Sequence, residues 1–136
     1  MKIGLDIHGV IDTNPEFFRK FTEGLKIGYN RMNHDCAEIH ILTGSRLGDG
    51  KIKEQLEEMG ISYTHLFSIS DYLKDKGCQE LYMSTDSNPW FFDKDWNMAK
   101  ADYARAHKLD LVLDDNNDYF PHFTTPIARF YSKDKK

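Results

Sequence analysis

The sequence lacks long apolar runs, paired cysteines and an excess of positive charge. No stretch approaches the roughly 20 apolar residues of a membrane span, and Asp6 interrupts the first apolar segment too early for a signal peptide. Cys36 and Cys78 lie far apart, so we expect free thiols in the reducing cytoplasm. The group His34, Cys36 and His40 matches no familiar zinc spacing. A net charge of −4 argues against general nucleic-acid binding.

The apolar content is sufficient for one compact core. The chain has 136 residues, of which 40% are hydrophobic and 13% aromatic. It contains no internal repeat and no linker-like segment, so we expect a single domain over residues 1–136. The expected core includes five phenylalanines, Phe17, Phe18, Phe21, Phe120 and Phe123.

Apolar runs alternate with helix-like segments along the chain. Strands are expected over residues 2–5, 37–42, 63–69, 109–113 and 126–131, and helices over residues 49–59, 70–76 and 95–108. Asn14 followed by Pro15 predicts the N-cap and first position of a further helix. Residues 78–95 have no clear pattern. The alternation predicts a three-layer α/β/α sandwich with a mostly parallel, Rossmann-like sheet of about five strands.

Polar residues follow three of the expected strands. The first strand runs into Asp6-Ile7-His8-Gly9, the second into Thr43-Gly44-Ser45-Arg46, and the fourth into Asp114-Asp115-Asn116-Asn117-Asp118. One aspartate after a strand means little, because aspartate is common in turns. In a parallel sheet, however, the carboxyl ends of the strands meet at one edge, where ligands bind. Three such strand ends therefore predict one shared site.

These segments resemble the motifs of the haloacid-dehalogenase-like (HAD) phosphatases. LDIHGVID resembles the first motif, ILTGSR the second and LVLDDNNDY the fourth. The third motif is a lysine near a helix start, for which Lys100 in a first helical turn is the natural match and Lys94 the reserve. The resemblance covers residues 1 to about 131. The short segments between the motifs imply a member without a separate cap domain. Such an open site is expected to accept bulky substrates, such as a phosphorylated polymer end, or to rely on a partner for closure, and the expected substrate is a phosphorylated small molecule or polymer end.

The resemblance implies magnesium-dependent hydrolysis of a phosphate ester, with Asp6 as the nucleophile that forms an aspartyl phosphate. A cation is needed because the carboxylate and the phosphate repel each other. The implied Mg²⁺ ligands are Asp6, the backbone carbonyl of His8, and acids after the fourth strand, with Asp115 preferred, Asp114 next and Asp118 as an alternative. The implied phosphate contacts are Thr43, Gly44, Ser45 and Lys100, with Arg46 either joining them or pairing with a surface carboxylate.

His8 stands where most of these phosphatases carry an aspartate that acts as acid and then base. An imidazole can perform both steps near neutrality. Asp12, four residues later, is interpreted as a turn or cap residue. The alternative function is a catalytically impaired binding domain that retains the metal and phosphate pocket. A receiver domain fits less well, because its paired acids follow the first strand. Trp90-Phe91-Phe92 is interpreted as a plug or a small lid.

Overall fold

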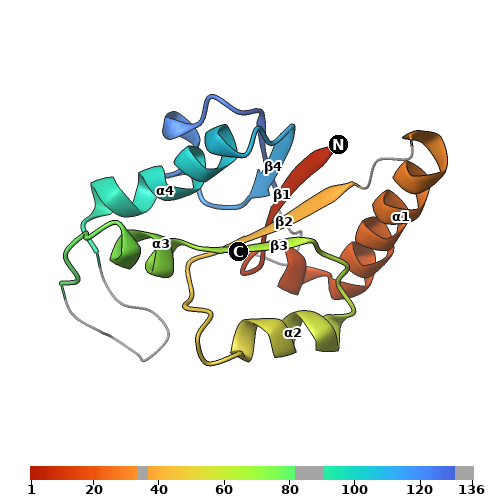
Figure 1. Ribbon diagram of the computed structural model, residues 1–136, viewed down its shortest axis with the longest axis horizontal. Helices are drawn as coiled ribbons and strands as arrows, with labels where there is room; N and C mark the ends of the chain where they lie inside the picture. The colour runs from red at the N-terminus through yellow and green to blue at the C-terminus, as the bar shows by residue number, and fades with distance from the viewer. Residues whose placement is uncertain (34–36, 82–90, 131–136) are drawn as a thin grey trace.

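The computed structural model describes residues 1–33, 37–81 and 91–130, with residues 27–33 described by their backbone only (Figure 1). The strands are β1 (Lys2–Asp6), β2 (Glu38–Thr43), β3 (His65–Ser68), β4 (Leu111–Asp114) and β5 (Ile127–Arg129). The helices are α1 (Pro15–Asn33), α2 (Lys51–Met59), α3 (Ile69–Asp75) and α4 (Asp93–Ala106), with short 3-10 turns η1 (Ile11–Thr13) and η2 (Phe120–His122).

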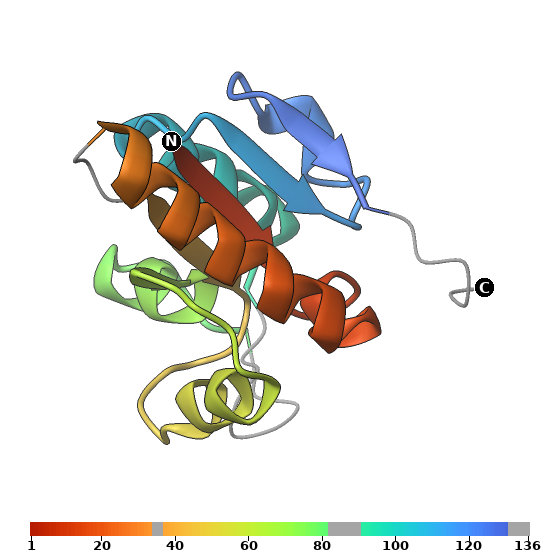
Figure 2. The same cartoon turned by 90° about the vertical axis from the view of Figure 1, so that its right-hand side faces the viewer.

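The five strands form one all-parallel sheet in the order β3-β2-β1-β4-β5. Figure 2 shows α1 in front of the sheet and α4 behind it. One core lies between the sheet and the helices α1 and α2, and a second core lies between the sheet and the helices α3 and α4. The predicted three-layer, Rossmann-like α/β sandwich is therefore confirmed.

Successive residues of β1 face opposite cores, as expected for a central strand. Ile3 and Leu5 pack in the α1 core, while Gly4 faces the α4 core. A Cβ atom on Gly4 would lie 3.0 Å from Leu42 and 3.1 Å from Val112. A larger residue at position 4 would therefore require the side chains of Leu42 and Val112 to move.

Local hydrogen bonds set the ends of the helices. The backbone N–H of Phe17 donates to Asn14 Oδ1 at 3.2 Å, and α1 begins at Pro15, both as predicted. The expected third strand reached residue 69, but β3 ends at Ser68, whose Oγ accepts from the backbone N–H of Asp71 at 3.1 Å and caps α3. Gly60 ends α2 with a φ of +70°, a conformation that favours glycine.

The prediction that Phe17 is a core residue is wrong. Its exposed fraction is 49%, because the buried face of α1 runs through Phe18 and Thr22. Phe17 instead stacks on the partly buried Phe21, with ring centroids 5.8 Å apart. The side chains of Phe120 and Phe123 are only partly buried.

The two described aromatic residues ahead of α4 lie in different environments, one in the core and one at the surface. Phe91 is buried in the core under α4, and Phe92 is exposed. Trp90 lies outside the described residues. The plug interpretation therefore fits Phe91, whereas the lid interpretation of the whole segment stays a prediction.

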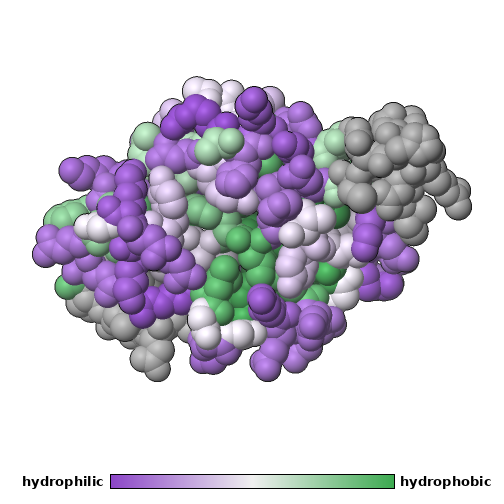
Figure 3. All heavy atoms as spheres, in the orientation of Figure 1, coloured by the Kyte–Doolittle hydropathy of each residue, from purple (hydrophilic) through white to green (hydrophobic). Residues whose placement is uncertain are grey.

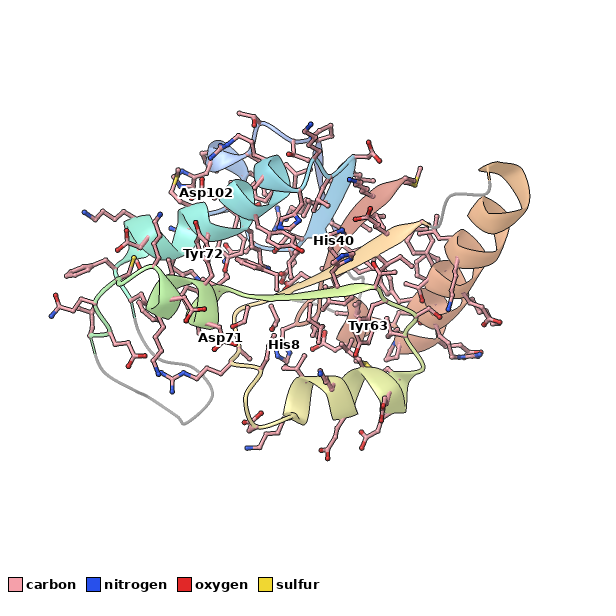
Figure 4. All side chains as sticks on the ribbon, viewed as in Figure 1. His8, His40, Tyr63, Asp71, Tyr72 and Asp102 are labelled. Atoms are coloured by element: carbon pink, nitrogen blue, oxygen red, sulfur yellow. The ribbon has the colours of Figure 1, made fainter. Side chains whose placement is uncertain are left out.

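Apolar surface gathers at the middle of the face viewed in Figure 3, where β3 lies in Figure 1. A hollow of about 390 Å³ beside this edge strand is lined by Leu66 and Phe67 of β3, by Tyr72 of α3, and by Asp102 and Tyr103 of α4. Figure 4 labels Tyr72 and Asp102 on their two helices. None of the helices in the described part of the chain is both long and apolar enough to cross a membrane.

Candidate active site

The candidate site lies at the point where the strand order reverses. The chain adds β2 and then β3 on one side of β1, and returns to place β4 on the other side. Asp6 is the last residue of β1 and Asp114 is the last residue of β4. Open parallel sheets bind ligands in the crevice outside the carboxyl ends of such neighbouring strands. The topology thus brings together two carboxylates that are 108 positions apart in the sequence.

Lys100 joins these two carboxylates. Its Nζ lies 3.0 Å from Asp6 Oδ1 and 2.7 Å from Asp114 Oδ2, and all three side chains are buried. The helix α4 begins at Asp93, so Lys100 lies about two turns after the helix start, rather than in the first turn. Lys94, the reserve candidate, is exposed on α4.

Burial and the oppositely charged neighbours have opposite effects on the pKa of Asp6, and likewise on the pKa of Lys100. Burial raises the pKa of the Asp6 carboxyl, and the ammonium of Lys100 only partly offsets that rise. Burial lowers the pKa of Lys100, but the carboxylates of Asp6 and Asp114 more than compensate, so its pKa is raised. Lys100 therefore stays protonated well above neutral pH. The second oxygen of Asp114, Oδ1, accepts from the backbone N–H of Asn116 at 3.0 Å.

Three carboxylates of the site can hold a divalent cation together. Asp6, Asp114 and Asp115 each offer one oxygen, and these oxygens lie within 4.8 Å of one another. Three carboxylates against one ammonium leave an excess of two negative charges, which one divalent cation neutralises. Oxygen ligands of this kind suit Mg²⁺. Asp118 is exposed and does not belong to this group of described residues.

A pocket of about 240 Å³ opens onto this group. Its lining comprises Asp6, His8, Gly44, Ser45, Trp96, Lys100, Asp115, Asn116 and Tyr119, none of which lines the larger hollow beside β3. The pocket thus combines four of the predicted catalytic or metal residues, which are Asp6 at the end of β1, His8 in the turn after it, Lys100 of α4 and Asp115 in the loop after β4. It also contains three residues that the sequence analysis did not select, Trp96, Asn116 and Tyr119.

An aromatic pair forms one wall of the pocket. Trp96 Nε1 donates to the hydroxyl oxygen of Tyr119 at 2.9 Å, and the Tyr119 ring centroid lies 5.0 Å from Lys100 Nζ. A Cβ atom on Gly44 would fall 2.8 Å from Trp96 Cζ2, so glycine lets the indole close over this loop. Trp96 precedes Lys100 by four residues, and this helical spacing could have identified it as a neighbour of the site.

The residues after β2 take different positions. Gly44 and Ser45 line the pocket, but the fully buried Thr43 does not, and its Oγ1 accepts from the backbone N–H of Ser45 at 3.2 Å. Thr43 therefore shapes the loop that faces the pocket. Arg46 forms an ion pair with Glu80, which is the carboxylate alternative that the sequence left open.

His8 lies at the exposed rim of the pocket and contacts Asp12. Its side chain is 59% exposed, and its Nδ1 lies 3.2 Å from Asp12 Oδ2. The other oxygen, Asp12 Oδ1, accepts from the backbone N–H of Gly9 at 2.8 Å. Asp12 is thus a turn residue, as predicted, and it also holds one side of the imidazole, which the sequence analysis missed. A proton on Nδ1 satisfies this contact and leaves Nε2 for another partner.

Comparisons of the chain with protein-family models, with curated proteins and with solved structures find no match.

Proposed function

We propose that this chain is a magnesium-dependent phosphohydrolase of the HAD type, which hydrolyses a phosphate ester through an aspartyl phosphate on Asp6. The observation that carries the proposal is the buried contact of Lys100 with both Asp6 and Asp114 beside Asp115, at the crevice between β1 and β4. Such a group concentrates positive and negative charge where a phosphate and a cation must be bound together.

In this proposal Asp6 attacks phosphorus, and the bond between phosphorus and the leaving oxygen breaks. Lys100 holds the Asp6 carboxylate and neutralises charge on the phosphoryl oxygens, while the loop of Gly44 and Ser45 supplies backbone donors to them. Mg²⁺ bound by Asp6, Asp115 and Asp114 would neutralise the remaining negative charge and polarise the phosphoryl group. Water then attacks the aspartyl phosphate, which releases inorganic phosphate and regenerates the Asp6 carboxylate.

His8 would transfer the protons of these two steps. Protonated on Nε2, it gives that proton to the leaving oxygen. Neutral again, it accepts a proton from the attacking water. Asp12 would act as a positioning residue, because its contact with Nδ1 orients the ring. In this proposal, a bound substrate would cover the exposed side chain of His8 at the rim of the pocket.

The pocket limits which part of a substrate is enclosed. A volume of about 240 Å³ accommodates a phosphoryl group with its cation but little more. The leaving group would therefore extend from the pocket, so the substrate is either a phosphorylated small molecule or a phosphorylated polymer end. We place the protein in the cytoplasm, where the free thiol of Cys78 is stable.

A second candidate function is a binding domain that keeps the metal and phosphate pocket without turnover. The observation that favours it is His8 itself, whose exposed side chain occupies the position where the resembling phosphatases carry aspartate. A phosphohydrolase should both bind and hydrolyse a phosphate ester, whereas a binding domain should bind phosphate without hydrolysing any ester.

Metal removal should test the proposed function directly. With a panel of small phosphates and phosphorylated oligonucleotide ends, we expect phosphate release in the presence of Mg²⁺. A chelator should reduce the rate to background and added Mg²⁺ should restore it, because the carboxylates then regain their counter-charge. Turnover that persists with chelator would contradict the proposal. Magnesium-dependent binding of inorganic phosphate without turnover of any ester would favour the binding domain.

Changes at His8 should depend on the leaving group of the substrate. His8→Asn should lower the rate on an alkyl phosphate by about 10²- to 10⁴-fold, because the alkoxide leaves poorly without a proton. The loss should be small on p-nitrophenyl phosphate, whose leaving group needs little assistance. His8→Asp, which restores the usual acid, should retain activity.

Asp12→Asn is the matched test of ring orientation. Its amide can still accept from the backbone N–H of Gly9 but offers an N–H to His8 Nδ1, which favours the unsuitable tautomer. The rate on the alkyl phosphate should therefore fall for this variant as well. Equal losses on both substrates, for either variant, would argue against proton transfer by His8.

A further inference from the structure

The amino ends of β2 and β3 carry a second polar cluster, which the proposed phosphatase chemistry does not use. Glu38 and His40 alternate along β2 and so lie on the same face of the sheet. His65 of β3 is the register partner of His40. Figure 4 shows His40 beside the start of β3, well separated from His8. Two histidines and one carboxylate thus meet at the end of the sheet opposite to the acidic site.

The potential ligand atoms of this cluster lie close together. Glu38, His40 and His65 each offer one such atom, all within 4.8 Å of one another. His40 Nε2 lies 2.9 Å from Glu38 Oε1. The imidazoles of His40 and His65 are stacked, with ring centroids 4.2 Å apart. A set of two imidazole nitrogens and one carboxylate oxygen is typical of Zn²⁺, whereas Mg²⁺ prefers a set made of oxygen ligands only.

The hydroxyl of Thr64 contacts Nδ1 of His65. Thr64 Oγ1 accepts from the backbone N–H of Ile39 at 2.9 Å and donates to the Ile39 carbonyl at 3.2 Å. The same oxygen lies 2.8 Å from His65 Nδ1. When Nδ1–H donates to this hydroxyl, Nε2 of the neutral ring carries the lone pair that binds a metal.

His40 and Glu38 also have contacts at the atoms that face away from the proposed metal, which are Nδ1 of His40 and Oε2 of Glu38. The hydroxyl of Tyr103 lies 2.6 Å from His40 Nδ1, and Lys2 Nζ lies 3.6 Å from Glu38 Oε2. A hydroxyl can donate to Nδ1 while Nε2–H contacts Glu38. When a metal binds Nε2, the ring proton moves to Nδ1, and the hydroxyl then accepts from Nδ1–H. Outer contacts of this kind orient metal ligands in known sites.

We propose that Glu38, His40 and His65 form a Zn²⁺ site with water as the fourth ligand. Tetrahedral ligands about 2.0–2.2 Å from zinc lie roughly 3.4 Å apart, so the cluster must contract. The exposed ring of His65 supplies that movement by leaving its stack on His40, whose ring is buried and held by Tyr103. Bound zinc would link the edge strand β3 to β2.

Calorimetric titration with Zn²⁺ should test this site, with Mg²⁺ present in large excess to occupy the acidic cluster. We expect one Zn²⁺ per chain and a higher thermal midpoint, because the ion binds only the folded cluster. His65→Gln should weaken zinc binding by at least about 100-fold, since it removes a direct ligand from an exposed position. His122→Gln, in η2 and outside the cluster, is the matched control and should bind as the parent does.

Tyr103→Phe separates orientation from ligation. It keeps the ring that packs against Phe67 and His107 but removes the hydroxyl beside His40, so zinc affinity should fall by about 10-fold. With Co²⁺ as a spectroscopic probe, the parent should give the visible absorption of a tetrahedral ion, and His65→Gln should lose it. Equal zinc affinity of the parent and His65→Gln would overturn the proposal. Loss of zinc binding in Asp115→Asn, but not in His65→Gln, would place the ion at the acidic site instead and would equally overturn it.

Discussion

Replacing Asp6 with asparagine should abolish phosphate-ester turnover while the protein stays folded. The amide lacks the charge that attacks phosphorus, so we expect a loss of about 10⁴-fold or more, as for removal of other covalent nucleophiles. Its oxygen can still accept from Lys100, which is 3.0 Å from Asp6 Oδ1 in the parent. Steady-state phosphate release and thermal unfolding measure the two effects.

Asp118→Asn is the matched control for this substitution, because Asp118 is an exposed aspartate in the loop after β4. It should leave the rate within a few-fold of the parent if Asp115 and Asp114 hold the cation. The parent, quenched during turnover, should carry a phosphoryl group on Asp6. A fully active Asp6→Asn variant would exclude the covalent route, whatever the other residues do.

Replacing Lys100 with methionine should give the largest loss of stability. The ammonium is buried between Asp6 and Asp114, and its removal leaves two carboxylates in a protein interior without their common partner. Removing one partner of a buried ion pair costs about 3–5 kcal/mol. Denaturant unfolding should reveal this loss, and phosphatase activity should disappear with it. Lys94→Met, at an exposed position of the same helix, should change the free energy of unfolding by less than about 0.5 kcal/mol.

The stability difference between the parent and Lys100→Met should depend on pH. Burial raises the pKa of Asp6 above its ordinary 3.8 even with the lysine present. Without the lysine the folded state takes up protons at still higher pH than the unfolded state does, so acidification favours folding of the variant. The gap should therefore narrow as the pH falls from 7 toward 4. A gap that stays constant over this range would mean that the carboxylates are not the origin of the loss.

At alkaline pH, the free energy of unfolding of the parent should decrease as Lys100 loses its proton. The pKa of Lys100 is raised in the folded state above its ordinary 10.5. Its stabilising contribution is then complete below pH 10.5 and decreases as the pH rises above that value, because the unfolded chain loses the proton first. Lys100→Met should lack this component of alkaline destabilisation.

The sheet and the acidic strand ends could be predicted because they depend on local patterns. Strands buried on both faces appear as short apolar runs, and Asp6 and Asp114 stop two of them. Parallel pairing then requires that these ends meet. Lys100 could be selected for its position in the helix that leads into β4, although the start of that helix was placed two residues too late.

The remaining contacts depend on relationships that a sequence does not display. The pairing of His40 with His65 requires the register of β2 and β3, and the contact of Trp96 with Tyr119 requires the packing of α4 against the loop after β4. The contact between Asp12 and His8 depends on how the turn after β1 closes. Phe17 was misplaced because two adjacent phenylalanines on a helix leave open which one faces the sheet.

The strand order also has a consequence for the chain during its synthesis on the ribosome. Once β3 has emerged, β1, β2 and β3 can pair, but the far edge of β1 must wait for β4, whose first residue is Leu111. Until α4 and β4 arrive, only the short helix α3 can cover Leu42 and Phe67 on their side of the sheet. The nascent protein therefore passes through a stage with an open strand edge and an incompletely covered apolar face, both of which promote aggregation. A chain that stalls before residue 93 would depend on chaperones to survive that interval.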